Sequence, residues 1–193
     1  MTRFILHVLA LAVILTSATA KSLNCYPFSF VDRNQWGAEP AKGQTALGAP
    51  VQFVVIHHSY QPGVCLTRQE CITAMRSMQS FHQNDQGWVD IGYNFAVGGE
   101  GSVYEGRGWE NVGAHAVGYN AQSIGICIIG DWINVLPPRE ALEATKQLIQ
   151  IGVSLGYISP NYVLMGHRQA SDTECPGSAL FNEISTWDQF RRD

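Results

Sequence analysis

Two potential metal ligands lie eight residues apart in a polar stretch that follows a short apolar run. His167 and Cys175 belong to the segment 166–177, and the apolar residues 162–165 precede it. Neutral imidazole and thiolate are both good zinc ligands. One regular helix or strand would not bring the two side chains together, so the segment must double back as a loop. The alternative is a surface turn closed by Pro176-Gly177, with a cysteine that forms a disulfide.

A third potential ligand follows the strongest strand signal in the chain. Residues 51–56 are rich in β-branched side chains and almost continuously apolar, which is typical of a strand buried on both faces. His57 and His58 come directly after it, where sheet proteins tend to carry ligand-binding groups. His57, His167 and Cys175 would together give three zinc ligands with a fourth position open to water. That ligand count is typical of a catalytic zinc site.

Two further side chains could take part in chemistry at such a site. Zinc lowers the pKa of bound water towards neutrality and polarises a carbonyl group, which suits hydrolysis of an amide. Tyr93 could donate its phenolic hydrogen to the developing oxyanion, and Thr173 could position the water or the oxyanion. The sequence has no HExxH motif with its adjacent glutamate, so the identity of the general base stays open.

The elements that must position these residues are both strands and helices. Strands are predicted for residues 51–56, 93–97, 102–105, 123–130 and 162–165, with a glycine-rich turn joining the second and third as a hairpin. Helices are predicted from the capping box at Thr67 to about Asn84, from residues 137–138 to 156, and from 180 to 187. Residues 21–50 are expected to be irregular. The pattern predicts an α/β domain with a central mixed sheet of about five strands flanked by about three helices.

The first twenty residues are typical of a secretion signal. Arg3 precedes an apolar run over 5–15, and Ala18-Thr19-Ala20 is a small-residue cleavage site. The apolar run is too short to span a membrane, and no other stretch approaches the necessary length. We therefore expect a secreted, extracellular protein in which residues 1–20 are the signal peptide and 21–193 form a single domain.

Charge and cysteine content narrow the class of protein. The chain has a net charge of −4, which becomes −5 without residues 1–20 because Arg3 is their only charged residue. A mildly acidic domain with no run of lysine or arginine lacks the footprint of a nucleic-acid binder and the polybasic patch of a membrane-surface protein. The five cysteines are an odd number, so at least one is outside any intramolecular disulfide. Cys65 and Cys71 are the expected pair, Cys127 is expected to be buried, and Cys25 is unassigned.

The chain also resembles a known family, the peptidoglycan recognition proteins, which are related to zinc-dependent bacteriophage amidases. The resemblance covers about residues 30–190 and is to the catalytic, zinc amidase type, similar to secreted insect members. It is carried by blocks that occur in one order along the chain: Trp36-Gly37-Ala38, Val55-Ile56-His57-His58-Ser59, Asp90-Ile91-Gly92-Tyr93-Asn94-Phe95, Val103-Tyr104-Glu105-Gly106-Arg107-Gly108-Trp109, Gly113-Ala114-His115, Ser123-Ile124-Gly125-Ile126, Gly166-His167-Arg168 and Thr173-Glu174-Cys175-Pro176-Gly177.

The resemblance implies a zinc-dependent N-acetylmuramoyl-L-alanine amidase with a groove for the muramyl-peptide stem. By the family pattern, Zn²⁺ is bound by His57, His167 and Cys175. Tyr93 and Thr173 match its catalytic positions, and Cys65 and Cys71 match its short disulfide. Contacts with the substrate are implied for Tyr93, His82, His115 and Asn120, and as a weaker match for His58, for which a structural hydrogen bond is the alternative.

A further part of the resemblance concerns the substrate. Gly87 and Trp88 together with Arg107 resemble the family pattern for stems that contain meso-diaminopimelic acid. This residue differs from lysine by an extra carboxylate, which a guanidinium can pair with bidentately. The alternative is that Arg107 only braces its loop.

The identity of residue 175 separates enzyme from receptor within the family. Non-catalytic members commonly carry serine at the position of Cys175, and a serine hydroxyl is a poor zinc ligand because it stays protonated. We therefore expect an active amidase that acts on bacterial peptidoglycan fragments (muropeptides) and so modulates innate immune signalling. The alternative is a non-catalytic peptidoglycan-binding receptor. We expect a monomer with no nucleic-acid partner and no membrane span.

Overall fold

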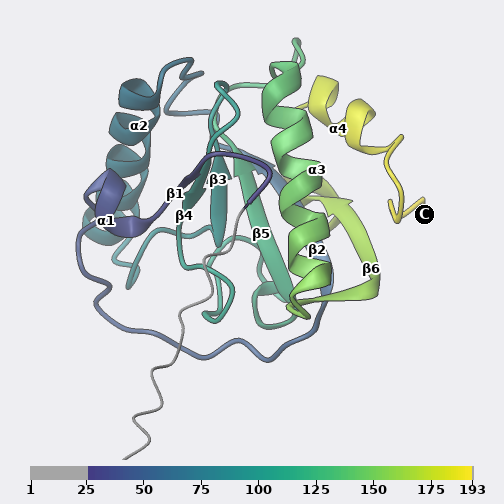
Figure 1. Ribbon diagram of the computed structural model, residues 1–193, viewed down its shortest axis with the longest axis horizontal. Coiled ribbons are helices and arrows are strands. Elements are labelled where there is room, and N and C mark those ends of the chain that lie inside the picture. The colour runs from purple at the N-terminus through teal and green to yellow at the C-terminus, as the bar shows by residue number, and fades with distance from the viewer. Residues whose placement is uncertain (1–25, 193) are drawn as a thin grey trace, which may run out of the picture.

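The computed structural model describes residues 26–192 and contains one mixed sheet with helices on both of its faces (Figure 1). The sequence-predicted secretion signal and Cys25 lie outside these residues. The strands are β1 (Phe30–Val31), β2 (Val51–His58), β3 (Phe95–Val97), β4 (Val103–Glu105), β5 (Ser123–Ile128) and β6 (Ile158–Gly166). The α-helices are α1 (Arg33–Trp36), α2 (Arg68–Ser80), α3 (Arg139–Ser154) and α4 (Ser178–Ile184). The predicted fold class is confirmed, with six strands and four α-helices in the described part instead of about five and three.

The direction of the strands brings the carboxyl ends of four of them, β2, β3, β5 and β6, to one edge of the sheet. The sheet order is β1-β4-β3-β5-β2-β6. β2 lies between β5 and β6 and is parallel to both, β3 is parallel to β5, and β3 and β4 form the predicted antiparallel hairpin. β2 is an interior strand with helices over both faces of the sheet, which explains its nearly continuous apolar sequence. β2 is longer than predicted, and His57 and His58 are its last two residues.

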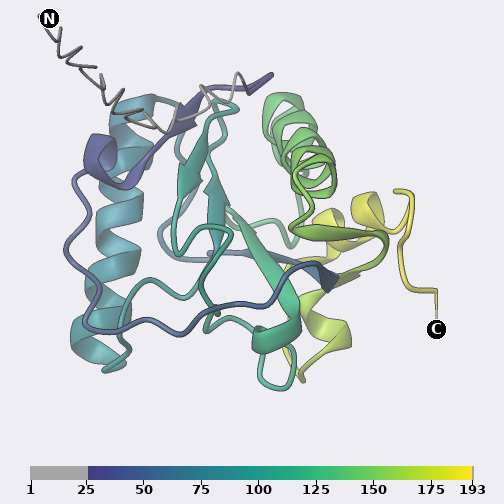
Figure 2. The ribbon, with the colours of Figure 1, turned by 60° about the horizontal axis from the view of Figure 1, so that its bottom comes forward.

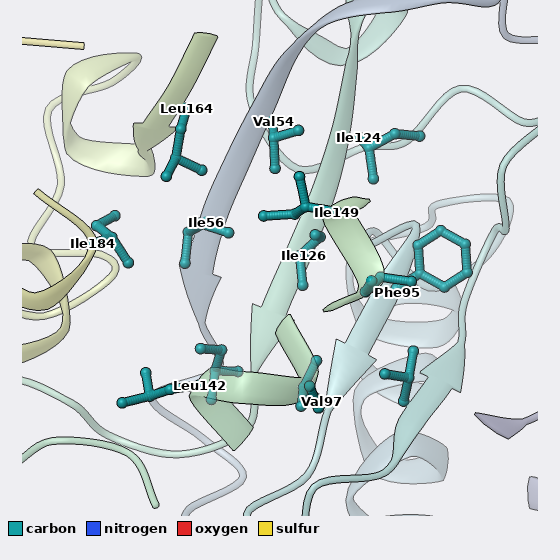
Figure 3. Close-up of a cluster of buried hydrophobic side chains, with 14 of the residues drawn as sticks. Val54, Ile56, Phe95, Val97, Ile124, Ile126, Leu142, Ile149, Leu164 and Ile184 are labelled. Atoms are coloured by element: carbon teal, nitrogen blue, oxygen red, sulfur yellow. The ribbon is translucent and has the colours of Figure 1, made fainter. Parts of the chain in front are cut away.

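The two faces of the sheet carry separate apolar layers. Helices α3 and α4 pack against a cluster that includes Val54 and Ile56 of β2 and Ile126 of β5 (Figure 3). Helices α1 and α2 cover the other face, as the second view of the ribbon shows for α2 (Figure 2). Successive strand residues point to opposite faces. His57 is the register partner of Cys127, which belongs to the α2 layer, so both side chains point towards α2.

The expectation that residues 21–50 are irregular is wrong at β1 and α1. Both elements are very short, two and four residues, so neither has the periodicity from which a sequence pattern predicts structure. Helix α1 is held by a capping box in which Asp32 Oδ1 accepts from Gln35 N at 2.8 Å. Trp36 anchors it, because this fully buried side chain donates from Nε1 to the carbonyl oxygen of Glu105 at 2.8 Å.

Helix α2 begins as predicted and ends differently. The capping box at Thr67 is present, with Glu70 as its third residue. The α-helix ends at Ser80 and continues as a π-helical turn over Phe81–Asp85, where the sequence predicted helix to about Asn84.

The predicted Cys65–Cys71 disulfide is confirmed, and Cys127 is buried as expected. Among residues 26–192, no helix is long and apolar enough to cross a membrane.

Candidate metal centre and active site

The three predicted ligands meet at the carboxyl edge of the sheet. His57 is on β2, His167 follows β6 directly, and Cys175 lies on the loop after it. Their ligand atoms all lie within 4.8 Å of one another, and His57 Nδ1 is 3.7 Å from Cys175 Sγ. A tetrahedral zinc ion with ordinary bond lengths would hold a nitrogen and a sulfur ligand about 3.6 Å apart. The donor set and its spacing therefore fit zinc.

The loop between His167 and Cys175 doubles back because its own backbone closes it. Arg168 N donates to the carbonyl oxygen of Cys175 at 2.8 Å, and Arg168 Nη2 donates to that of Glu174. Cys175 N donates to Thr173 Oγ1 at 3.2 Å. The Cys175 sulfur also accepts from His58 N at 3.4 Å, which ties the loop to the end of β2.

Burial keeps the ligands in defined protonation states. The pKa of His57 lies well below its ordinary value, mainly because the ring is buried and also because His115 and His167 are close. His57 is therefore neutral, as a metal ligand must be. Burial raises the pKa of the Cys175 thiol to about 12, so this group stays protonated in the absence of a metal ion.

The ligands open onto a cavity of about 290 Å³ that also holds the two sequence-predicted catalytic residues, Tyr93 and Thr173. The Tyr93 ring lies 5.3 Å from that of His57. Burial raises the pKa of Tyr93 well above 10, so its hydroxyl keeps the hydrogen that it would donate to an oxyanion. The lining comprises His57, His58, Ser59, Tyr60, His82, Trp88, Tyr93, Ala114, His115, His167, Thr173 and Cys175.

His82 and Trp88 form one wall of this cavity. Their rings stack with centroids 4.7 Å apart and planes within 15° of parallel. His82 Nδ1 accepts from Gly92 N at 3.2 Å, so its single hydrogen is on Nε2. Gly87, the other residue of the predicted specificity pattern, is exposed and takes a left-handed conformation (φ 69°) after the π-helical turn. It does not line the cavity.

His58 combines a structural hydrogen bond with a position at the cavity wall. Its Nδ1 accepts from Trp132 N at 3.4 Å and lies 4.0 Å from a carboxylate oxygen of Asp131. Burial lowers the pKa of His58 more than Asp131 raises it. The neutral ring therefore carries its hydrogen on Nε2.

His115 and Asn120, for which the family resemblance implies substrate contacts, form hydrogen bonds with other groups of the protein. His115 lines the cavity, but Nδ1 lies 3.0 Å from His57 Nε2 and its Nε2 lies 3.4 Å from Ser123 Oγ. Asn120 is outside the cavity lining. Its Oδ1 accepts from the backbone N–H groups of His115 and Ala116, both at 2.8 Å, and so shapes the loop that carries His115.

Arg107 also lies outside the cavity lining. Its guanidinium donates to three backbone carbonyl oxygens, those of Ile91 at 2.7 Å, Val112 at 2.8 Å and Asp90 at 3.3 Å. It lines a separate pocket together with Arg33. The bracing contacts that the sequence allowed as an alternative are therefore present.

Sequence reasoning did not single out several residues at the site. Tyr60 lines the cavity with 54% of its surface exposed and a left-handed backbone (φ 56°), and its position directly after His57, His58 and Ser59 was the available signal. Ser123 belongs to one of the blocks that carry the resemblance, but its contact with His115 depends on how the loop before β5 folds.

The fold and the site together define a class: a mixed α/β domain in which two histidines and a cysteine form a potential metal site that opens onto a cavity. Residues 47–178 match the model of the N-acetylmuramoyl-L-alanine amidase family. Peptidoglycan-recognition protein LB of Drosophila melanogaster is 52% identical over 160 residues, which cover 83% of this chain and 69% of the relative. Human N-acetylmuramoyl-L-alanine amidase is 45% identical over 161 residues, 82% of this chain and 28% of that longer protein.

A solved structure agrees with the sequence comparisons. A Drosophila PGRP-LB variant in complex with tracheal cytotoxin superposes with a TM-score of 0.84 at 50% identity, covering 84% of this chain and 96% of that one. The chain belongs to the peptidoglycan-recognition proteins of the N-acetylmuramoyl-L-alanine amidase family.

Proposed function

We propose that this protein is a zinc-dependent N-acetylmuramoyl-L-alanine amidase. It binds peptidoglycan fragments with meso-diaminopimelic acid stems and hydrolyses the amide between the lactyl group of N-acetylmuramic acid and L-alanine. The observation that carries the proposal is the convergence of His57, His167 and Cys175 within 4.8 Å at the wall of a cavity. Three protein ligands leave the fourth tetrahedral position for water.

The residues around the centre have complementary roles. Zinc, when bound, supplies a Lewis acid and lowers the pKa of a bound water. His57 Nδ1 and Cys175 Sγ, together with the His167 ring, would hold the ion. Tyr93 keeps its hydroxyl hydrogen and donates it to the oxygen of the scissile carbonyl as negative charge develops there. Thr173 accepts from Cys175 N at 3.2 Å, which leaves its hydroxyl hydrogen free to orient the water or the oxyanion.

The nature of the substrate is supported by the relatives. A homologous structure holds tracheal cytotoxin, and a second homologue, PGRP-LE, is described in complex with this same monomeric diaminopimelic acid-type peptidoglycan. The side chains available for contact are those that line the cavity, among them His58, His82 and Trp88. With the predicted secretion signal, these features support an extracellular enzyme that degrades bacterial fragments and so damps immune signalling.

Replacement of Cys175 tests the proposal directly. Wild-type protein is expected to bind one zinc ion per chain and to release stem peptide from muropeptides. Cys175→Ser is expected to lose bound zinc and to release peptide at least about 100-fold more slowly, because the serine hydroxyl stays protonated. Zinc content is measured by elemental analysis, and peptide release by mass spectrometry.

Cys127→Ser is the matched control for metal content, because it makes the same substitution at a buried thiol outside the cavity lining. We expect it to retain zinc. Release of stem peptide by Cys175→Ser at the wild-type rate would contradict the assigned centre. Wild-type protein that binds muropeptides and leaves them intact would be the non-catalytic receptor.

A further inference from the structure

A chain of hydrogen bonds leads from His57 into the interior of the protein. His57 Nε2 lies 3.0 Å from His115 Nδ1, and His115 Nε2 lies 3.4 Å from Ser123 Oγ. Ser123 Oγ donates to the carbonyl oxygen of Tyr119 at 2.8 Å. The three side chains are buried, with exposed fractions of 1% for His57, 8% for His115 and 0% for Ser123. Water therefore has little access to compete for these hydrogen bonds.

The carbonyl group at its end determines the direction of every bond in this chain. A carbonyl oxygen only accepts, so the shorter contact commits the Ser123 hydroxyl hydrogen to Tyr119. Ser123 Oγ must then accept from His115, which places the His115 hydrogen on Nε2. A neutral imidazole has one N–H group. His115 Nδ1 is therefore an acceptor, and His57 donates to it from Nε2.

The position of this hydrogen determines the protonation state of the other ring nitrogen of His57. With its hydrogen on Nε2, His57 presents an unprotonated Nδ1 towards Cys175 Sγ, 3.7 Å away. This is the tautomer that can bind a metal ion on the cavity side. The opposite tautomer would place a hydrogen where the ion must sit.

The surroundings hold the His115 ring in this position. It lies against Gly113 and Gly125, where an added Cβ would overlap the ring at either residue. Asn120 Oδ1 accepts from the backbone N–H of His115 at 2.8 Å and so holds its main chain. The ring has little space in which to turn away from His57.

We propose that His115 and Ser123 are positioning residues that select the metal-binding tautomer of His57. The inference rests on the proposed zinc centre and concerns residues that do not themselves bind the ion. Partners of this kind, which hydrogen-bond to a metal-ligating histidine, typically contribute 10- to 100-fold to metal affinity.

The tautomer can be observed without any metal ion. In metal-free protein labelled with ¹⁵N-histidine, ring nitrogen shifts distinguish Nδ1–H from Nε2–H. Wild type is expected to show His57 as the Nε2–H form. In Ser123→Ala the acceptor for His115 is lost, so His57 is expected to shift towards a mixture of both forms. A wild-type His57 in the Nδ1–H form would overturn the proposal, as would an identical His57 spectrum in Ser123→Ala.

Zinc affinity provides the second readout. Chelator competition is expected to show about 10-fold weaker binding for Ser123→Ala and about 10- to 100-fold weaker binding for His115→Leu. His115→Asn keeps an acceptor near the position of Nδ1 and should recover most of the loss. Ser159→Ala is the matched control at the far end of β6, a serine 9% exposed, and is expected to bind zinc as wild type does.

The two proposals fail in different ways. Wild-type zinc affinity in both Ser123→Ala and His115→Leu would overturn the positioning role and leave the zinc centre standing. Zinc binding by His115→Asn as weak as that by His115→Leu would also contradict the positioning role. The loss of affinity would then not depend on a hydrogen-bond acceptor at the position of His115 Nδ1. If wild-type protein binds no zinc, the proposed function fails, whereas the spectra of the metal-free protein still test the tautomer.

Discussion

At the scale of single residues, side chains of one type differ in role because their surroundings differ. His57 and His167 direct a nitrogen towards Cys175, whereas both ring nitrogens of His115 face other protein groups. His82 stacks on Trp88. The role of Arg107 likewise depends on its surroundings. Three of the five N–H groups of its guanidinium donate to backbone carbonyl oxygens. Any recognition of a substrate carboxylate must use the two that remain.

A substitution of Arg107 separates recognition from bracing. We expect wild type to cleave diaminopimelic-type fragments in preference to lysine-type ones. Arg107→Ala is expected to lower this preference by about 10- to 100-fold, the range for loss of one hydrogen bond to a charged group. The preference is measured as a ratio of kcat/KM values in digests that contain both fragments, analysed by mass spectrometry.

Arg33→Ala is the matched control for this experiment. Arg33 lines the same pocket and also braces the backbone, with Nη1 donating to the carbonyl oxygen of Gly106 at 2.6 Å. It is expected to change stability and leave the preference unaltered. Equal turnover of both fragments by wild type would refute the predicted specificity, and an unchanged preference in Arg107→Ala would leave Arg107 with bracing alone.

At the scale of elements, the π-helical turn after α2 places a titratable group in the wall of the cavity. This turn buries both His82 and Gln83, and Gln83 Nε2 donates to the carbonyl oxygens of Pro40 and Val89 at 3.1 Å. Such turns are frequent at functional sites. The pKa of His82 is lowered from 6.5 to about 4, mainly because its ring is buried and also because of Arg107.

This shift predicts a dependence of stability on pH. As the pH falls below 6.5, the unfolded chain binds a proton that His82 in the folded chain does not accept until about pH 4. Acid therefore favours unfolding over this interval. In metal-free protein, His82→Gln is expected to reduce the slope of the unfolding free energy between about pH 6 and 4.5 by up to about 1.4 kcal/mol per pH unit.

Urea denaturation at a series of pH values measures that slope. Asn84→Ala changes an exposed residue of the same turn and removes no titratable group, so it should keep the wild-type slope. A His82→Gln protein whose stability falls with acid as steeply as wild type would show that His82 is not protonated preferentially on unfolding.

At the scale of the whole molecule, the proposed metal centre connects segments that are distant in the chain. His57 is the penultimate residue of β2, while His167 and Cys175 come more than one hundred residues later. A ligand that binds only the folded state stabilises it by mass action, by about 2.7 kcal/mol at a concentration 100-fold above Kd. Zinc at that level is expected to raise the Tm by about 5–10 °C for a chain of this size.

Calorimetry with zinc and with a chelator tests this expectation. Cys175→Ser is expected to show little difference between the two conditions, because one ligand is missing. A zinc-dependent rise in Tm of the same size in Cys175→Ser would place the stabilising ion elsewhere in the molecule.

Local signals in the sequence predicted much of the fold and the composition of the candidate site. The apolar run of β2, the capping box of α2 and the glycine-rich hairpin are all present close to their expected positions. Each depends on neighbours within a few residues, which is the range over which periodicity and capping act. The proximity of His57, His167 and Cys175 was predictable as well, because histidine at a strand end and cysteine in a loop are chemically distinctive.

Local patterns in the sequence thus predicted the residues of the candidate metal centre, the strands and helices other than β1 and α1, and the Cys65–Cys71 disulfide. Only the tertiary structure shows the pairing of β1 with β4, the position of Arg107 against three carbonyls, and the series of hydrogen bonds from His57 through His115 to Ser123. The physical reason is the separation along the sequence of the residues that interact. Hydrogen-bond partners such as His57 and His115, 58 residues apart, are chosen when strands and loops cross in space, and no local pattern records that choice.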